Sequence, residues 1–270
     1  MSPRKSVSVG LSLVCFSVVT GAVGLSAGAQ TLTTLASLGG DAGAWAHGGV
    51  VADADGTLYG TAYGSGEGVG TIFELAASTH SLSQLGVFNG GNGANPEASL
   101  LLAPNGDLYG TSWGGGRYGQ GTLFKLPAGS STPVALYVAG DPTIGINPTS
   151  GLIADGNGNL YGTMTGGSDH LGSVFQFDPS TNTMTALATF SPGVNPDVHG
   201  HLWDDSAGNL YGTTASNGNS GGAGGIFKVD AATHTLTMLY SFNTYDGAFA
   251  QSGVIGDGKG NLYGTTTSGG

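Results

Sequence analysis

Cysteine and cationic side chains are scarce in this chain. Among its 270 residues there are one cysteine, Cys15, and six lysine and arginine residues, against 17 aspartate and glutamate residues. A single cysteine excludes an intrachain disulfide, so packing of the core must stabilise the fold. So few cations disfavour nucleic acid as a partner, because binding a phosphate backbone requires clustered lysine and arginine.

Long apolar runs are also missing after residue 30. The one extended apolar stretch, residues 7–25, follows the basic residues Arg4 and Lys5 and precedes the small residues 27–29. This order is typical of a secretory signal peptide, and we expect residues 1–29 to be removed. An uncleaved membrane anchor is the alternative interpretation. After cleavage, we expect no segment that spans a membrane.

Removal of the signal peptide would leave residues 30–270 with four basic and 17 acidic side chains, a formal charge of −13. This acidity suits the solubility of an exported protein and disfavours an anionic membrane surface. Glycine is abundant instead, at 53 residues, and it lies in clusters between apolar runs without a Gly-X-Y period. That distribution predicts many short strands joined by turns.

One tetrapeptide, Leu-Tyr-Gly-Thr, recurs five times at intervals of 50 or 52 residues. A fixed period of this size indicates a repeat architecture. We call this tetrapeptide the signature. It occupies residues 58–61, 108–111, 160–163, 210–213 and 262–265.

Each repeat divides into four segments, which we name strands A to D. In the third repeat they are an apolar run (151–154), the signature (160–163), a second apolar run (173–177) and an alternating Thr/apolar segment (183–190). The short apolar runs of strand A predict a strand buried on both faces. Four antiparallel strands per repeat are the content of a propeller blade. The sequence therefore predicts an all-β fold for residues 30–270: a β-propeller of four-stranded antiparallel blades, with five repeats of about 50 residues.

The two ends of the repeat region carry a further expectation. Residues 31–38 match the strand D segment 235–242, so the propeller is expected to begin with a D strand. The fifth repeat stops after strand B, and we expect its blade to be incomplete. Pairing the first strand with that blade is the usual way to close a ring, but its strand C is missing. Either the last blade is defective or the chain is truncated; its open edges would favour self-association.

At the signature and strand C, the chain resembles the GloVer tandem-repeat family of exported bacterial proteins. Residues 155–163, followed by a glycine-rich loop and residues 173–177, show the pattern, and the resemblance covers nearly all of residues 45–270. The turn and signature are also similar, over a shorter stretch, to NHL and SMP-30-like propellers. The resemblance implies a secreted protein and no established catalytic residue.

The B–C and D–A loops of a four-stranded blade emerge at the same face. In this chain they hold aromatic and polar residues that do not recur between repeats, and such loops are where a scaffold gains function. Exposed Trp and Tyr rings beside polar groups stack on sugars or grip peptides, so a glycan or protein partner is predicted; ordinary loop packing is the alternative. The candidate ligand-binding residues are Trp45, His47, Tyr63, Trp113, Arg117, Tyr118, Asp169, His170, His199 and Tyr245.

The turns between strands A and B are rich in Asp and Asn, the oxygen ligands that Ca²⁺ prefers. The calcium candidates are Asp53, Asp55, Asp155 and Asn157. However, no turn has a distal bidentate Glu, and an Asp or Asn that caps a hairpin turn explains the same residues. We therefore predict no cofactor and keep calcium as the alternative.

Three hypotheses for the function remain. We favour an exported, non-enzymatic binding or scaffold protein of the cell envelope or extracellular space, with its ligand face at the B–C and D–A loops. The second is a propeller enzyme, a lyase or hydrolase acting on an extracellular polymer through groups such as His199 and His201, which would point the same way on a strand. The third is a purely structural envelope module. Neither a Gly-x-Ser-x-Gly elbow nor a phosphate-binding Gly-Lys-Ser/Thr motif occurs.

Overall fold

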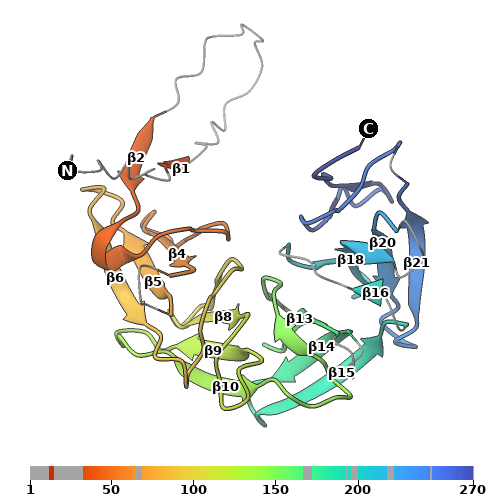
Figure 1. Ribbon diagram of the computed structural model, residues 1–270, viewed down its shortest axis with the longest axis horizontal. Coiled ribbons are helices and arrows are strands. Elements are labelled where there is room, and N and C mark those ends of the chain that lie inside the picture. The colour runs from red at the N-terminus through yellow and green to blue at the C-terminus, as the bar shows by residue number, and fades with distance from the viewer. Residues whose placement is uncertain are drawn as a thin grey trace, which may run out of the picture.

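A computed structural model describes residues 12–14, 33–64, 69–166, 172–191, 194–195, 200–217, 222–243 and 245–269. These residues are nearly all in strands, turns and loops, with one short 3-10 helix, η1 (Gly40–Ala42). No helix that they form is long and apolar enough to cross a membrane. The sheets follow one another around an arc that is open on one side, with the first repeat at one side of the opening and the fifth repeat at the other (Figure 1).

Each of the first four repeats folds into an antiparallel sheet with the strand order A-B-C-D, as the sequence predicts. Blade 1 contains β3 (Val51–Ala52), β4 (Leu58–Ala62), β5 (Thr71–Leu75) and β6 (Leu82–Val87). Blade 2 contains β7 (Leu101–Leu102), β8 (Leu108–Ser112), β9 (Thr122–Leu126) and β10 (Val134–Val138). Blade 3 contains β12 (Ile153–Ala154), β13 (Leu160–Thr165), β14 (Ser173–Asp178) and β15 (Thr183–Thr189). Blade 4 contains β17 (Trp203–Asp204), β18 (Leu210–Thr214), β20 (Gly225–Val229) and β21 (Leu236–Ser241).

The fifth repeat contributes β22 (Ile255–Gly256) and β23 (Leu262–Tyr263), which form a sheet of two strands within the described part of the chain. The expected first D strand is β2 (Thr34–Ser37). It pairs with β1 (Ser12–Val14), which lies inside the segment predicted to be a signal peptide, and not with the fifth repeat. A D strand pairs with strand C of its blade. Because the described residues of the fifth repeat include no strand C, β2 has no edge to join there.

Strand A differs from the sequence prediction. The expectation that it is buried on both faces is wrong, since Ala52 and Ala154 are exposed and the Ile255 side chain is 58% exposed. The residues just before these strands, such as Leu100 and Leu152, are buried instead. Strand A is the inner edge strand of each sheet, so no further strand covers its outer side. The residues of strand A itself are half-buried or exposed in every repeat.

The hydrophobic core lies between the blades. Ile72 and Phe88 of blade 1 pack with Leu108 and Leu126 of blade 2. Each strand C also contributes a fully buried ring, namely Phe73, Phe124, Phe175 and Phe227. The ring lies against the glycine of the adjacent signature, where an added Cβ would be 2.5–2.7 Å from the ring. The signature glycine is therefore required by the packing of strand C.

The signature threonine joins blades 1, 2 and 4 to the repeat that follows each of them. Its hydroxyl donates a hydrogen bond to a backbone carbonyl just before strand A of the following blade. These bonds run from Thr61 to Ala98 (3.0 Å), from Thr111 to Ser150 (2.9 Å) and from Thr213 to Ser252 (2.8 Å). The Thr163 hydroxyl of blade 3 is buried and has no such partner among the described residues.

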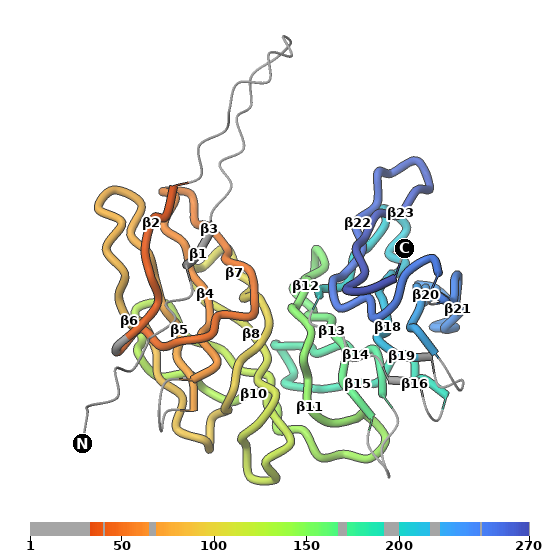
Figure 2. The backbone as a smooth tube through the Cα atoms, turned by 45° about the horizontal axis from the view of Figure 1, so that its top comes forward, coloured from red at the N-terminus to blue at the C-terminus, as the bar shows by residue number. Residues whose placement is uncertain are grey.

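The D–A and B–C loops lie on one face, as predicted, and they pair with each other. β11 (Ile146–Pro148) pairs with β13, and β16 (Val194–Asn195) pairs with β19 (Ser216–Asn217). Single bridges join Ala44 to Gly64 and Ala94 to Gly114. The short strands β11, β16 and β19 lie toward the lower edge of Figure 2. We call this side the loop face and the opposite side, formed by the A–B and C–D turns, the turn face.

Candidate functional site

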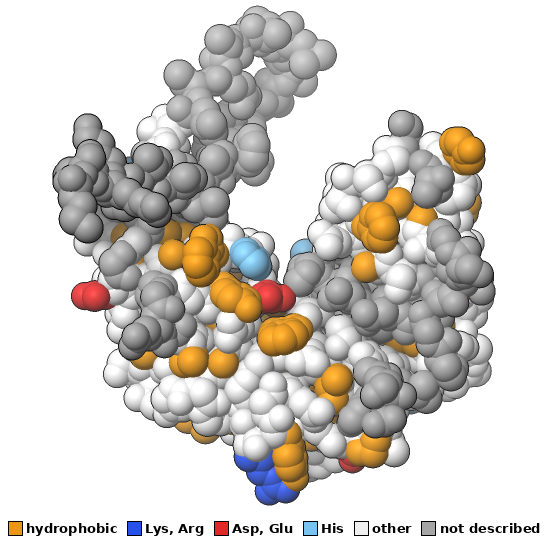
Figure 3. Space-filling model, viewed as in Figure 1, with side chains coloured by type: hydrophobic (Ala, Val, Ile, Leu, Met, Phe, Trp, Pro, Cys, Tyr) orange, Lys and Arg blue, Asp and Glu red, His pale blue; other side chains and the backbone are white. Residues whose placement is uncertain are grey.

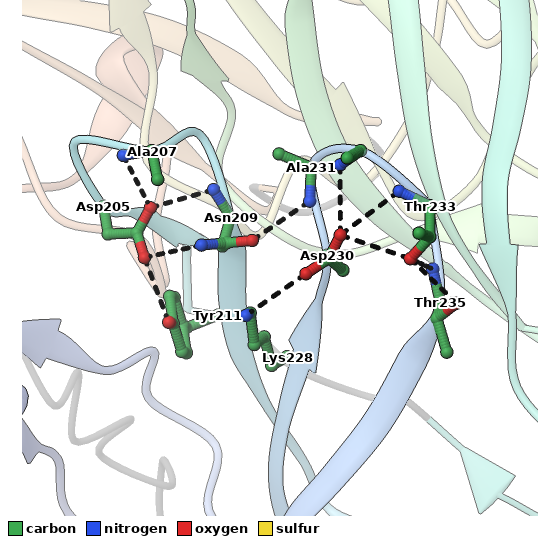
Figure 4. Close-up of polar contacts among 10 residues, drawn as sticks. Asp205, Ala207, Asn209, Tyr211, Lys228, Asp230, Ala231, Thr233 and Thr235 are labelled. Carbon is green, nitrogen blue, oxygen red and sulfur yellow. Dashed lines mark hydrogen bonds and ion pairs between the residues drawn. The ribbon is translucent and has the colours of Figure 1, made fainter.

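On the turn face, the repeated aspartate and tyrosine form the same hydrogen bonds in four repeats. In blade 4, Asp205 Oδ1 accepts the Ala207 and Asn209 amides at 2.9 Å, and Oδ2 accepts the Tyr211 hydroxyl at 3.1 Å (Figure 4). We call this Asp–Tyr contact the turn staple. It recurs from Tyr59 to Asp53, from Tyr161 to Asp155 and from Tyr263 to Asp257. The staple assigns the signature tyrosine a structural role.

The calcium candidates all lie in these turns. The Asp53 and Asp155 carboxylates each accept two backbone amides and a tyrosine hydroxyl. Asp55 and Asn157 are exposed and donate the first of these amides. No group of three or more His, Cys, Asp and Glu side chains among the described residues is placed to hold a metal. The contacts at these aspartates are those of capped hairpin turns.

The staple favours the ionised form of its aspartate and the neutral form of its tyrosine. Burial raises the pKa of Asp155, but hydrogen bonds from Asn159, Tyr161 and the turn amides outweigh this and hold the pKa below its usual value. Burial, followed by the hydrogen bond to Asp155 and its charge, raises the pKa of Tyr161 to about 12. The corresponding causes raise the pKa of Tyr59 to about 12. Asp stays ionised and Tyr stays neutral across a wide pH range.

Blade 2 has no staple, because Ala103 occupies the position of the aspartate. Asp107 holds this turn instead. Its Oδ1 accepts the Ala128 amide of the C–D turn at 2.9 Å, and its Oδ2 pairs with Lys125 Nζ at 3.3 Å. In blade 4, Asn209 makes the corresponding bridge to the C–D turn (Figure 4). Blade 2 therefore lacks the staple but has a hydrogen bond between its A–B and C–D turns.

On the loop face, one D–A position has a left-handed backbone in four repeats. It is occupied by Trp45 (φ 58°), Asn95 (φ 57°), Asn147 (φ 46°) and Phe249 (φ 54°). Asparagine tolerates this conformation, whereas a bulky aromatic residue is an outlier there. The Trp45 and Phe249 side chains are nevertheless 57% and 49% exposed. Core packing does not account for these two aromatic residues, which makes their positions candidates for function.

Three of the candidate residues form one group in blade 1. The His47 and Tyr63 rings are stacked with their centroids 5.5 Å apart, and the Tyr63 amide donates to the Trp45 carbonyl at 3.1 Å. Trp113, which is 45% exposed, is the blade 2 counterpart of Tyr63. Asn95 connects the two loops. Its amide donates a hydrogen bond to the Val69 carbonyl in the blade 1 loop, and its carbonyl accepts the Trp113 amide. Figure 3 shows hydrophobic side chains, a histidine and a carboxylate next to one another along the inner edge of the arc.

The remaining candidates do not join this group. The Arg117 guanidinium lies 4.3 Å from the centre of the Tyr118 ring and contacts its hydroxyl. That ring lies beside Gly140, which follows the outer strand β10, so the pair is at the outer rim. Tyr245 belongs to the fifth repeat and is 90% exposed. The other three candidates, Asp169, His170 and His199, lie outside the described residues.

Sequence reasoning missed Phe249. The signal was present, because Trp45, Asn95, Asn147 and Phe249 all stand 13 residues before their signatures. Aligning the repeats at this position separates two asparagines, which suit a left-handed turn, from two aromatic residues, which do not. Only the backbone φ angles show that this position is left-handed, and therefore that an aromatic residue is unusual there.

The chain belongs to the Gloeobacter/Verrucomicrobia repeat family, whose profile matches residues 21–165 and 95–270. This confirms the resemblance based on the signature and strand C. No curated protein matches the chain.

Solved structures share the propeller-like fold at low identity. The extracellular domain of a one-component system from B. thetaiotaomicron is 14% identical with a TM-score of 0.55; the match covers 82% of this chain and 26% of that one. A gluconolactonase from Xanthomonas campestris is 18% identical with a TM-score of 0.53, over 81% and 68% of the two chains. TolB from Acinetobacter baumannii is 18% identical with a TM-score of 0.51, over 76% and 45%. The chain thus spans about a quarter of the first of these proteins. Similarity at this level shows the fold alone.

Proposed function

We propose that this protein is an exported, non-enzymatic binding protein whose ligand lies on the loop face, against Trp45, His47, Tyr63 and Trp113. The observation that carries the proposal is the left-handed conformation of Trp45. This conformation costs a residue other than Gly, Asn or Asp about 1–2 kcal/mol. The Trp45 ring is mostly exposed, so burial does not offset that cost. A ligand that stacks on the ring would do so.

A glycan is the ligand class that this group fits best. Indole, phenol and imidazole rings offer flat apolar faces for sugar rings and polar edges for hydroxyl groups. Lysine and arginine are missing from the group itself, and basic side chains on this face are seen only at the outer rim (Figure 3). The group therefore does not need a charged ligand, and a neutral polysaccharide is compatible with it. A protein partner is the alternative outcome of the experiment.

The experiment is to measure binding to a panel of polysaccharides for the wild type and for Trp45→Asn, Trp113→Ala and Val134→Ala. Asparagine is the natural residue at the equivalent position of two other repeats, so Trp45→Asn should keep or raise the melting temperature while weakening binding about tenfold. Val134, an exposed residue of the outer strand β10, is the matched control and should leave binding unchanged. Unchanged affinity in both tryptophan variants would reject the site. A lower melting temperature for Trp45→Asn would make Trp45 a structural residue.

Export is proposed on the signal-peptide pattern of residues 1–29. Expression of the full chain in a Gram-negative host should yield a product outside the cytoplasm that begins at Gln30, as determined by N-terminal sequencing. The enzyme alternative has less support. The gluconolactonase likeness concerns the fold, and of the two histidines considered for catalysis only His201 is among the described residues.

A further inference from the structure

A groove of about 250 Å³ lies between blades 3 and 4 on the turn face, away from the proposed ligand site. Both blades line it. Leu187 and Ile153 of blade 3 and Leu210 and Val229 of blade 4 give it apolar walls, and Asp204 on β17 stands among its polar residues. Its volume is below the ~300–1,000 Å³ typical of sites for drug-sized ligands. The groove therefore suits a single extended side chain.

Asp204 is not explained by the repeat. The equivalent strand A residues are Ala52, Leu102, Ala154 and Gly256, none of which is charged. The Asp204 side chain is exposed, and no hydrogen bond or ion pair reaches it from the described part of the chain. A residue that breaks a structural repeat without a structural contact is a candidate for function.

The charges around the groove are not balanced. In blades 2 and 4 a lysine on strand C pairs with a turn-face carboxylate, Lys125 with Asp107 at 3.3 Å and Lys228 with Asp230 at 3.4 Å. The equivalent residue of blade 3 is the neutral Gln176, which lines the groove.

Asp155, also in the lining, accepts hydrogen bonds from neutral donors only and so keeps its full negative charge. Among the causes that raise the pKa of Tyr161, after burial and the bond to Asp155, is the charge of Asp204. The lining also includes His234 and a third carboxylate, Asp230, which pairs with Lys228. The groove therefore combines apolar walls with two carboxylates, Asp155 and Asp204, with which no lysine or arginine among the described residues pairs.

We infer that this groove binds a basic side chain, lysine or arginine, presented by a protein partner. The aliphatic stem of such a side chain would pack on Leu187 and Leu210, while its cationic head would lie at the Asp204 carboxylate. The bound cation would take the place that Lys125 and Lys228 hold in the neighbouring blades. This inference concerns the turn face and does not depend on the proposed ligand site on the loop face.

The test is a titration with acetyl-Gly-Ser-Lys-Ser-Gly-amide, followed by NMR of the isotope-labelled protein at low salt. The same peptide with norleucine in place of lysine keeps the stem and removes the charge. The lysine peptide should shift signals of groove residues and bind more tightly than the norleucine peptide. Asp204→Asn should weaken lysine-peptide binding about fivefold, the effect of one partly screened ion pair. Ala154→Phe should block the groove by bulk, because Ala154 lines it.

Asp55→Asn is the matched control, since Asp55 is an exposed turn-face aspartate of blade 1 outside the groove. It should leave the affinity unchanged. Equal weakening by Asp55→Asn would show general charge attraction and overturn the inference. So would equal binding of the two peptides, or undiminished binding to a folded Asp204→Asn variant. Spermidine that binds as tightly as the peptide through Asp204 would identify a free amine as the ligand and reject the protein partner.

Discussion

At the scale of single residues, an aspartate and a tyrosine six positions apart hold each turn that has a staple. The contact is local in sequence, so each repeat that carries both residues forms it independently of its neighbours. Its carboxylate also accepts two turn amides, which would otherwise need water or another acceptor as a partner. In the Asp-rich turns that suggest calcium in the sequence, backbone amides and a tyrosine hydroxyl donate hydrogen bonds to the first aspartate.

The staple of blade 3 should contribute measurably to stability. Tyr161→Phe removes the hydroxyl that donates to Asp155 at 2.9 Å. Because a hydrogen bond to a charged acceptor is stronger than a neutral one, the variant should lower the free energy of unfolding by about 1–2 kcal/mol. Tyr109→Phe is the matched control, since blade 2 has Ala103 in place of the aspartate; it should cost less than about 0.5 kcal/mol. Equal losses in urea unfolding of the two variants would contradict the role of the staple.

At the scale of elements, the signature connects three levels of packing. Its tyrosine fixes the turn before strand B, its glycine admits the phenylalanine ring of strand C, and its threonine reaches the next blade. Only the first of these could be inferred from residues close in sequence. The glycine and threonine contacts join different strands or blades, and the sequence shows only that both residues recur.

The threonine contact can be tested with a matched pair. Thr111→Val removes a buried hydroxyl and leaves the Ser150 carbonyl of the next blade without its donor. The buried carbonyl should cost about 1–3 kcal/mol of unfolding free energy. Thr163→Val makes the same chemical change where the buried hydroxyl has no partner in the described part of the chain, so it should be neutral or stabilising. Equal destabilisation by both substitutions, measured by thermal and urea unfolding, would show that the hydrogen bond does not join the blades.

At the scale of the whole molecule, acidic residues occur in the loops of both faces. Ten of the 17 acidic residues lie in or beside the turns of the turn face, with three lysines. The ten are Asp53, Asp55, Glu74, Asp107, Asp155, Asp178, Asp204, Asp205, Asp230 and Asp257. The aromatic group lies on the other face. The proposed ligand site and the proposed groove therefore lie on opposite sides of the molecule.

Stability should depend on pH through the aspartates of the A–B turns and the tyrosines of the staples. The folded-state pKa values of Asp107, Asp155 and Asp205 are below the usual 3.8, so their contribution is present above that pH and is lost as the pH falls through the folded values. Those of Tyr59 and Tyr161 are raised from 10.0 to about 12, so the contribution of the neutral tyrosines is lost as the pH rises from 10 to 12.

Urea unfolding at a series of pH values should therefore give a plateau between about pH 4 and 10, with losses on both sides. The double variant Tyr59→Phe/Tyr161→Phe should lose less stability between pH 9 and 11 than the wild type does. A stability that rises over this range in the wild type would contradict the assignment.

The sequence by itself determined the four-stranded antiparallel arrangement of each blade. The recurrence of the signature, the alternation of strand D and the Asp, Asn and Gly turns depend on neighbours within a few residues, and such local preferences are visible in one dimension. The loop face was also predicted, because an antiparallel blade places alternate loops on the same side. The tertiary structure decided the exposure of strand A, the left-handed aromatic residues Trp45 and Phe249, and the groove beside Asp204. The groove arises where two blades meet, and the left-handed residues lie where D–A and B–C loops meet, so both depend on contacts between segments that are distant in sequence.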